Sequence, residues 1–203
     1  MFRLMVVTDR QRSTRPITET VRLALEGGAD AVQLRERDME AGEFHQLAEA
    51  LRQVTREAGA RLIVNHRLDV ALSVEADGVH IGWRSLGVRD ARKLGGDRFI
   101  IGVSCHNMVQ IRSAEEAGAD YVMLGPVFAT PSKEGLVDPL GLDALRQAVA
   151  AVKVAIVAIG GITPENVSSV LDTGVAGIAA ISAIIAAEDP RAAAQALRKG
   201  LTA

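Results

Sequence analysis

The sequence has little of three things that would point to specialised classes of protein. Cys105 is the single cysteine among 203 residues, so no intramolecular disulfide can form and a reducing compartment is expected. Lysine and arginine number 23 against 25 acidic residues, and this balance disfavours direct binding of nucleic acid. No uninterrupted apolar stretch reaches the roughly 18 residues of a membrane span, and the apolar run 4–7 is too short for the core of a signal peptide. We therefore expect a cytoplasmic protein that acts away from membranes.

Aromatic residues are also scarce, at 3% of the chain. The apolar fraction of 48% excludes a disordered chain, because so much apolar surface favours a packed core. The length fits one domain, and no linker or low-complexity stretch divides the sequence. A single domain over residues 1–203 is the prediction.

A short motif recurs along the chain. It reads GGADAVQL at 27–34, EADGVHI at 75–81, AGADYVMLG at 117–125 and, in blurred form, DTGVAGIA at 172–179. Each copy joins a residue suited to end a helix to an apolar run typical of a strand buried on both faces. Eight such strands are predicted: Leu4–Asp9, Ala31–Glu36, Arg61–Asn65, Gly78–Gly82, Ile100–Cys105, Tyr121–Val127, Val154–Gly160 and Gly177–Ile181.

Segments with helical periodicity separate these strands. The predicted helices are Pro16–Leu25, Gly42–Ala58, Asn107–Ala117, Leu142–Val152, Pro164–Leu171 and Pro190–Leu197, with shorter ones after the third and fourth strands. Eight strands alternating with helices predict an α/β fold, a closed (β/α)8 TIM barrel, whose interior is filled mainly by aliphatic side chains. An open doubly wound sheet is the alternative.

Polar residues gather where the predicted strands end, which in a barrel is the catalytic face. The pairs Gly160-Gly161 and Ser182-Ala183 follow the seventh and eighth strands. Loops at these two places, together with a helix start, are the usual phosphate site of the barrel. The plainer alternative is that the glycine pair only turns the chain.

Alternation along the second predicted strand places Gln33 and Arg35 on one face. Either they line a ligand pocket and bind polar or anionic groups, or Arg35 pairs with a carboxylate inside the barrel. Lys133 is the only cation in the polar segment 130–135, which is a candidate for closing over substrate. Without further signals, a lone lysine of this kind is more often solvated.

Histidine supplies the candidate proton-transfer groups. His106 follows the fifth predicted strand and is the preferred acid/base residue; His66, after the third, is a weaker candidate. His80 lies inside the fourth strand, where a hydrogen-bonded core histidine is the plain interpretation. No histidine or cysteine spacing matches a zinc site.

The motifs at the strand ends resemble those of the thiamin phosphate synthase family and its sister group, the thiazole tautomerases. The matching segments are QLRER (33–37), VNH (64–66), ADGVHIG (76–82), GVSCH (102–106), ADYVMLGPVFATPSK (119–133), AIGGITPEN (158–166) and ISAI (181–184). They occur in order over nearly the whole chain. The resemblance implies a TIM barrel that binds a thiazole phosphate through Gly160, Gly161, Ser182 and Ala183.

The sequence departs from the synthase pattern at the positions that hold magnesium. The pattern has aspartate where this chain has His66 and Ser85, and lysine where it has Arg37. Mg²⁺ prefers carboxylate oxygens, and two such ligands are lost here. The resemblance therefore favours the tautomerase branch, whose metal-independent isomerisation aromatises a carboxylated thiazole phosphate.

On this interpretation, His106 moves the proton and no cofactor is needed. The substrate would be bound by Gln33, Arg35, Asn65, Ser104, Thr130, Ser132 and Lys133. One alternative is a working synthase that recruits Mg²⁺ through Asp9, Glu36 or Glu134, and another is a non-catalytic, regulatory barrel that binds thiazole or thiamin phosphate. The expected partner is a small-molecule thiazole phosphate. A homo-oligomer is left open, as are the roles of Trp83 and His66.

Overall fold

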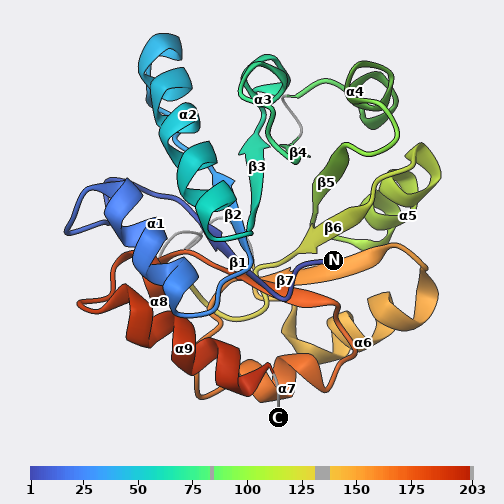
Figure 1. Ribbon diagram of the computed structural model, residues 1–203. Helices are drawn as coiled ribbons and strands as arrows, with labels where there is room; N and C mark the ends of the chain where they lie inside the picture. Colours follow the sequence, from blue (N-terminus) through green and yellow to red (C-terminus); the bar gives the residue numbers. More distant parts are fainter. Residues whose placement is uncertain (83–84, 131–137, 202–203) are drawn as a thin grey trace.

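Eight parallel strands close into a barrel in the computed structural model, which describes residues 1–82, 85–130 and 138–201 (Figure 1). Every strand pairs with its sequence neighbour, and the last pairs with the first, so the open sheet is excluded. The strands are β1 (Leu4–Val7), β2 (Ala31–Leu34), β3 (Arg61–Asn65), β4 (Gly78–Ile81), β5 (Ile100–Cys105), β6 (Tyr121–Leu124), β7 (Ala155–Ile159) and β8 (Gly177–Ala180).

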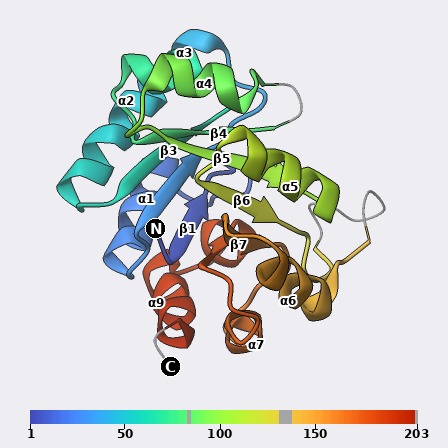
Figure 2. The ribbon, with the colours of Figure 1, turned by 90° about the vertical axis from the view of Figure 1, so that its right-hand side faces the viewer.

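Helices cover the outside of the barrel, as both ribbon views show (Figures 1 and 2). They are α1 (Ile17–Glu26), α2 (Ala41–Glu57), α3 (Leu68–Ser73), α4 (Val88–Gly95), α5 (Met108–Ala117), α6 (Gly141–Ala151), α7 (Val167–Leu171), α8 (Ser182–Ile185) and α9 (Pro190–Gly200). The predicted TIM barrel is confirmed, including short helices after β3 and β4. Within the described residues, no helix has the length and apolar character needed to cross a membrane.

Three predicted strands extend too far at their carboxyl ends, and one predicted helix begins too early. The predicted strands beginning at Leu4, Ala31 and Tyr121 each end two or three residues earlier in the structure. Their polar or turn-forming last residues leave the ladder and enter the loops. The predicted helix 164–171 begins only at Val167, because the side chain of Asn166 bonds to Thr163 N (2.9 Å) and Gly161 O (2.9 Å) and holds the preceding residues in a turn.

Alternation along the strands builds two apolar layers. On β1, Leu4 and Val6 face the helices, whereas Met5 and Val7 face the interior of the barrel. Both sets are buried, which explains the continuous apolar runs in the sequence. Towards the carboxyl ends of the strands, polar side chains such as Arg35, Asn65 and Ser104 replace the apolar filling, and a site opens there.

The repeated Ala-Asp of the motif secures the opposite end of the barrel. Asp30 accepts hydrogen bonds from Arg3 N and Leu4 N, Asp77 from Leu62 N and Asp120 from Ile101 N, all at 2.7–3.0 Å. Each carboxylate thus satisfies the backbone at the start of a strand next to its own. The recurring aspartates belong to the fold and lie away from the ligand-binding end.

Candidate functional site

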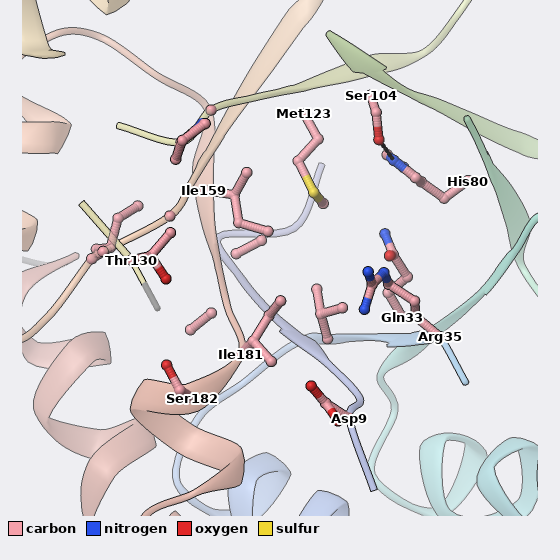
Figure 3. Close-up of a pocket in the computed structure, with 18 of the residues that line it drawn as sticks. Asp9, Gln33, Arg35, His80, Ser104, Met123, Thr130, Ile159, Ile181 and Ser182 are labelled. Atoms are coloured by element: carbon pink, nitrogen blue, oxygen red, sulfur yellow. Dashed lines mark hydrogen bonds between the residues drawn. The ribbon is translucent and has the colours of Figure 1, made fainter. Parts of the chain in front are cut away.

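A cavity of about 1040 Å³ opens at the carboxyl ends of the strands. Among the described residues, all those that the sequence predicts for the site line it: Gln33, Arg35, Asn65, Ser104, His106, Thr130, Gly160, Gly161, Ser182 and Ala183. Figure 3 shows Gln33 and Arg35 on one side, with Ser182 and Thr130 on the other. Ser132, Lys133, Glu134 and Trp83 lie outside the described residues, as does most of the segment 130–135 predicted to close.

The glycine pair after β7 forms one wall of this pocket. Gly160 and Gly161 have φ angles of 101° and 67°, which favour glycine. A Cβ on Gly161 would lie 2.7 Å from Ala129 O, so the close approach also requires glycine. Ser182 begins α8 on the neighbouring strand end and lines the same pocket. Backbone N–H groups exposed by glycines suit an anion such as phosphate.

Arg35 lies half-buried on the pocket wall opposite Ser182 (Figure 3). Burial lowers the pKa of its guanidinium, and the charge of Arg37, which also lines the pocket, lowers the pKa further. In the described part of the chain, no carboxylate forms an ion pair with Arg35; Glu36 points the other way and accepts from Arg10 N at 3.0 Å. The internal ion pair considered for Arg35 is therefore absent there, and the cation faces the cavity.

The backbone fixes the orientation of the His106 ring. Its Nδ1 lies 2.7 Å from Gly125 O, and because a carbonyl oxygen can only accept, Nδ1 carries a hydrogen and donates. In the neutral ring, Nε2 then has the lone pair. This is the arrangement of a base whose second nitrogen is held by its surroundings.

His66 and Ser85 bond to each other where the resemblance expects magnesium ligands. His66 Nδ1 and Ser85 Oγ form a hydrogen bond, and Gly82 N donates to Ser85 Oγ at 3.1 Å. Because Ser85 Oγ accepts from Gly82 N, its own proton is available to His66 Nδ1. The two side chains thus satisfy each other, and neither offers a carboxylate.

The neighbouring carboxylates do not restore a magnesium site. Asp9 lines the pocket but forms an ion pair with Arg12 at 3.0 Å, and Glu36 is bound to Arg10. Among the residues that the structure describes, no group of three or more histidine, cysteine, aspartate or glutamate side chains is placed to hold a metal. Since Mg²⁺ requires several oxygen ligands, this donor set does not fit it.

His80 is a hydrogen-bonded core histidine, as predicted. Its Nδ1 lies 3.0 Å from the Tyr121 hydroxyl and its Nε2 lies 2.8 Å from Ser104 Oγ. Burial lowers the pKa of the ring to about 3, with smaller effects from His66 and Arg35. Sequence reasoning missed Tyr121, because only the pairing of β4, β5 and β6 brings these residues together.

The comparison with known proteins decides the family. The family model described as "Thiamine monophosphate synthase" matches residues 4–184. The chain belongs to the thiamine monophosphate synthase family. It is 50% identical to the "Thiamine-phosphate synthase" of Moorella thermoacetica over 198 residues, which cover 98% of this chain and 94% of the relative. The "Thiamine phosphate pyrophosphorylase" of Pyrococcus furiosus has a solved structure that covers 98% of this chain and 95% of its own, with a TM-score of 0.90 and 43% identity.

The relative from Moorella thermoacetica carries the synthase name. A relative from Geobacter sulfurreducens, 44% identical over 97% of this chain and 92% of its own length, is named a "Putative thiamine-phosphate synthase". The narrower assignment to the tautomerase branch, made from His66 and Ser85, is thus not what the relatives favour.

Proposed function

We propose that this chain is an enzyme of thiamine biosynthesis that binds a thiazole phosphate in the pocket at the carboxyl ends of its strands. Membership of the family supports the pathway. The positive-φ pair Gly160-Gly161 beside Ser182 supports an anion site, and the cations Arg35 and Arg37 support a second anionic group on the far wall.

The relatives favour the synthase reaction, and we place it first. In this reaction the thiazole nitrogen forms a bond to the methylene carbon of hydroxymethylpyrimidine pyrophosphate, and the bond from that carbon to the pyrophosphate oxygen breaks. The observation that carries it is the 50% identity to a thiamine-phosphate synthase over 98% of the chain. In this chain the departing pyrophosphate would lie against Arg35 and Arg37, whose positive charge stabilises it.

A second candidate is metal-independent tautomerisation, and a specific observation favours it. By the resemblance, His66 and Ser85 take the places of the two magnesium carboxylates, and in the structure they bond to each other. A tautomerase has no pyrophosphate to neutralise and needs neither carboxylate. His106, with Nδ1 donating to Gly125 O, would take a ring proton on Nε2 and return it to another ring position. A positioned acid/base group of this kind contributes about 10²–10⁴-fold to turnover.

One pair of assays separates the two reactions. Purified protein is given pyrimidine pyrophosphate, thiazole phosphate and Mg²⁺, and thiamin phosphate is measured with and without EDTA. Separately, the non-aromatic carboxythiazole phosphate is supplied, and its aromatisation is followed in the presence of EDTA. Thiamin phosphate formation establishes the synthase, whereas aromatisation alone establishes the tautomerase. A folded protein that does neither contradicts both proposals.

Substitution of His106 tests its role in the second reaction. His106→Asn should lower aromatisation about 10²–10⁴-fold, because the proton acceptor is gone, while the Kd for thiazole phosphate changes little. The matched control is His45→Asn on α2, outside the pocket lining, which should leave turnover unchanged. Equal turnover in both variants removes His106 from the mechanism.

A further inference from the structure

A chain of polar side chains crosses the interior of the barrel and ends in the pocket. It joins Tyr121 on β6, His80 on β4 and Ser104 on β5. Tyr121 and His80 are buried, with exposed fractions of 0% and 1%, whereas Ser104 opens into the pocket. Figure 3 shows the bond between His80 and Ser104 at the rim of the cavity. The mechanisms described above use neither Tyr121 nor His80.

The hydrogen bonds that link Tyr121, His80 and Ser104 can run in only one direction. The Tyr121 hydroxyl is buried, and His80 Nδ1, at 3.0 Å, is the acceptor within its reach in the described residues. Gln33 Nε2 donates to Met5 Sδ at 3.8 Å, and within the described residues no hydrogen bond joins Gln33 to the phenol. If His80 instead donated to the phenol, a buried hydroxyl proton would lack an acceptor, which proteins avoid. The phenol therefore donates to Nδ1.

The direction then carries over to Ser104. The His80 ring is buried and contacts no carboxylate in the described part of the chain, so it is neutral and has one N–H. Because Nδ1 accepts from Tyr121, the hydrogen is on Nε2 and is donated to Ser104 Oγ at 2.8 Å. The Ser104 oxygen thus accepts from within the barrel, and its own proton points to a partner in the pocket.

The packing around the phenol is built for this contact. A Cβ on Gly102 would lie 2.0 Å from Tyr121 Cζ and 2.4 Å from the hydroxyl oxygen, so the phenol reaches His80 only because residue 102 is glycine. The edge of the Phe2 ring closes the other side, with ring centroids 5.0 Å apart and planes at 86°. The hydroxyl has little freedom to turn elsewhere.

We propose that Tyr121 and His80 are positioning residues that fix the Ser104 hydroxyl as a hydrogen-bond donor to an acceptor atom on the heterocycle of the substrate. The pocket thereby selects a ring with a lone pair at that point over a ring with an N–H. The identity of the ring rests on the proposed function; the direction of the hydrogen bonds from Tyr121 through His80 to Ser104 does not. His80 stays neutral: it accepts a hydrogen bond at Nδ1 and donates one from Nε2. His106 remains the group that would transfer protons.

The direction is tested first, without substrate. Nitrogen-15 NMR of the labelled protein reports which ring nitrogen of His80 carries hydrogen. We expect Nε2–H in the wild type between pH 6 and 8, and a loss of this preference in Tyr121→Phe, where Nδ1 no longer receives a proton. An Nδ1–H tautomer in the wild type overturns the proposal, and this measurement needs no variant to fold.

Recognition is tested by a double-mutant cycle with thiamin phosphate, which contains both rings, and with thiazole phosphate. Ser104→Ala should weaken binding of at least one probe about 5- to 20-fold. Tyr121→Phe should weaken the same probe, yet add less than 2-fold in the Ser104→Ala background, because it acts through that hydroxyl. In the matched control, Tyr121→Phe should add its full effect to Ser182→Ala.

Additive losses in the first cycle, or unchanged affinity of Ser104→Ala for both probes, overturn the role in recognition. A wild-type protein that binds neither probe contradicts the proposed function instead, and leaves the tautomer measurement standing. The two failures are therefore distinguishable.

Discussion

Asp77 should be one of the most costly surface-accessible residues to remove, although it lies far from the pocket. Its carboxylate accepts three hydrogen bonds, from Leu62 N at 2.9 Å and from Nη1 of both Arg52 and Arg61 at 2.7 Å. The side chain is only 12% exposed. We consider Asp77→Ala, which removes all three bonds and leaves their donors in place.

The three losses differ in size. The Leu62 N–H at the start of β3 would be left without an acceptor, at a cost of about 1–3 kcal/mol. Arg52 is 16% exposed and its Nε already lacks a partner among the described residues, so losing its carboxylate costs about 1–2 kcal/mol more. Arg61 is 60% exposed and contributes under about 1 kcal/mol. The sum is about 2–6 kcal/mol, and its midpoint of about 4 kcal/mol corresponds to a fall in Tm of roughly 8–16 °C for a chain of this size.

Urea unfolding followed by circular dichroism at pH 7 measures this difference. The matched control is Asp69→Ala, which removes a carboxylate that is 65% exposed and paired with Arg67. The control should lose less than about 1 kcal/mol. If Asp77→Ala is no less stable than Asp69→Ala, the assignment of the recurring aspartates to barrel stability is wrong.

Three further outcomes follow from the structure. Burial raises the pKa of Asp77, but hydrogen bonds from Leu62 N and Arg61 and the nearby arginine charges outweigh it, so the net pKa is lowered. The stabilisation by the Asp77 carboxylate is present above the unfolded pKa of about 3.9 and is lost as the pH falls through the lower folded pKa. The difference in unfolding free energy between wild type and Asp77→Asn should therefore be smaller in urea titrations at pH 3 than at pH 7. Gly161→Ala should weaken thiazole phosphate binding more than about 10-fold in calorimetry, since a Cβ clashes there, whereas Gly59→Ala, with nearly the same φ of 66° and open space, should leave the Kd unchanged. Arg35→Met should weaken pyrophosphate binding about 10-fold or more, and equal affinity would place the second anion elsewhere.

Much of the fold could be predicted because the repeat has a local physical basis. Each copy of the motif places a residue with positive φ at the end of a helix: Gly28, Glu75, Gly118 and Gly174. The apolar run that follows can only be buried in a parallel sheet covered on both faces. Boundaries were less predictable, since a side chain can take over from the ladder at a strand end: Arg35 N donates to the Thr8 side-chain oxygen Oγ1 at 2.9 Å, whereas Thr8 N still donates to Gln33 O.

The sequence predicts which residues stand at each strand end of the site. It does not predict which of their side chains bond to one another. The position of His106 after β5 and of Gly160 after β7 follows from counting strands. By contrast, the bond between His66 and Ser85 joins residues 19 positions apart, and that between His80 and Tyr121 joins residues 41 apart. Such contacts depend on strand register and on side-chain direction, which composition and periodicity leave open.

The carbonyl that holds His106 is part of the barrel wall. The segment 125–128 continues along the end of β7, with Val127 N donating to Ile159 O and Phe128 N to Gly160 O, each at 3.0 Å. The anchor of the imidazole is thus secured by backbone bonds to the neighbouring strand end. Side chains between Pro126 and Phe128 can therefore differ between relatives while the carbonyl that orients the His106 ring keeps its place.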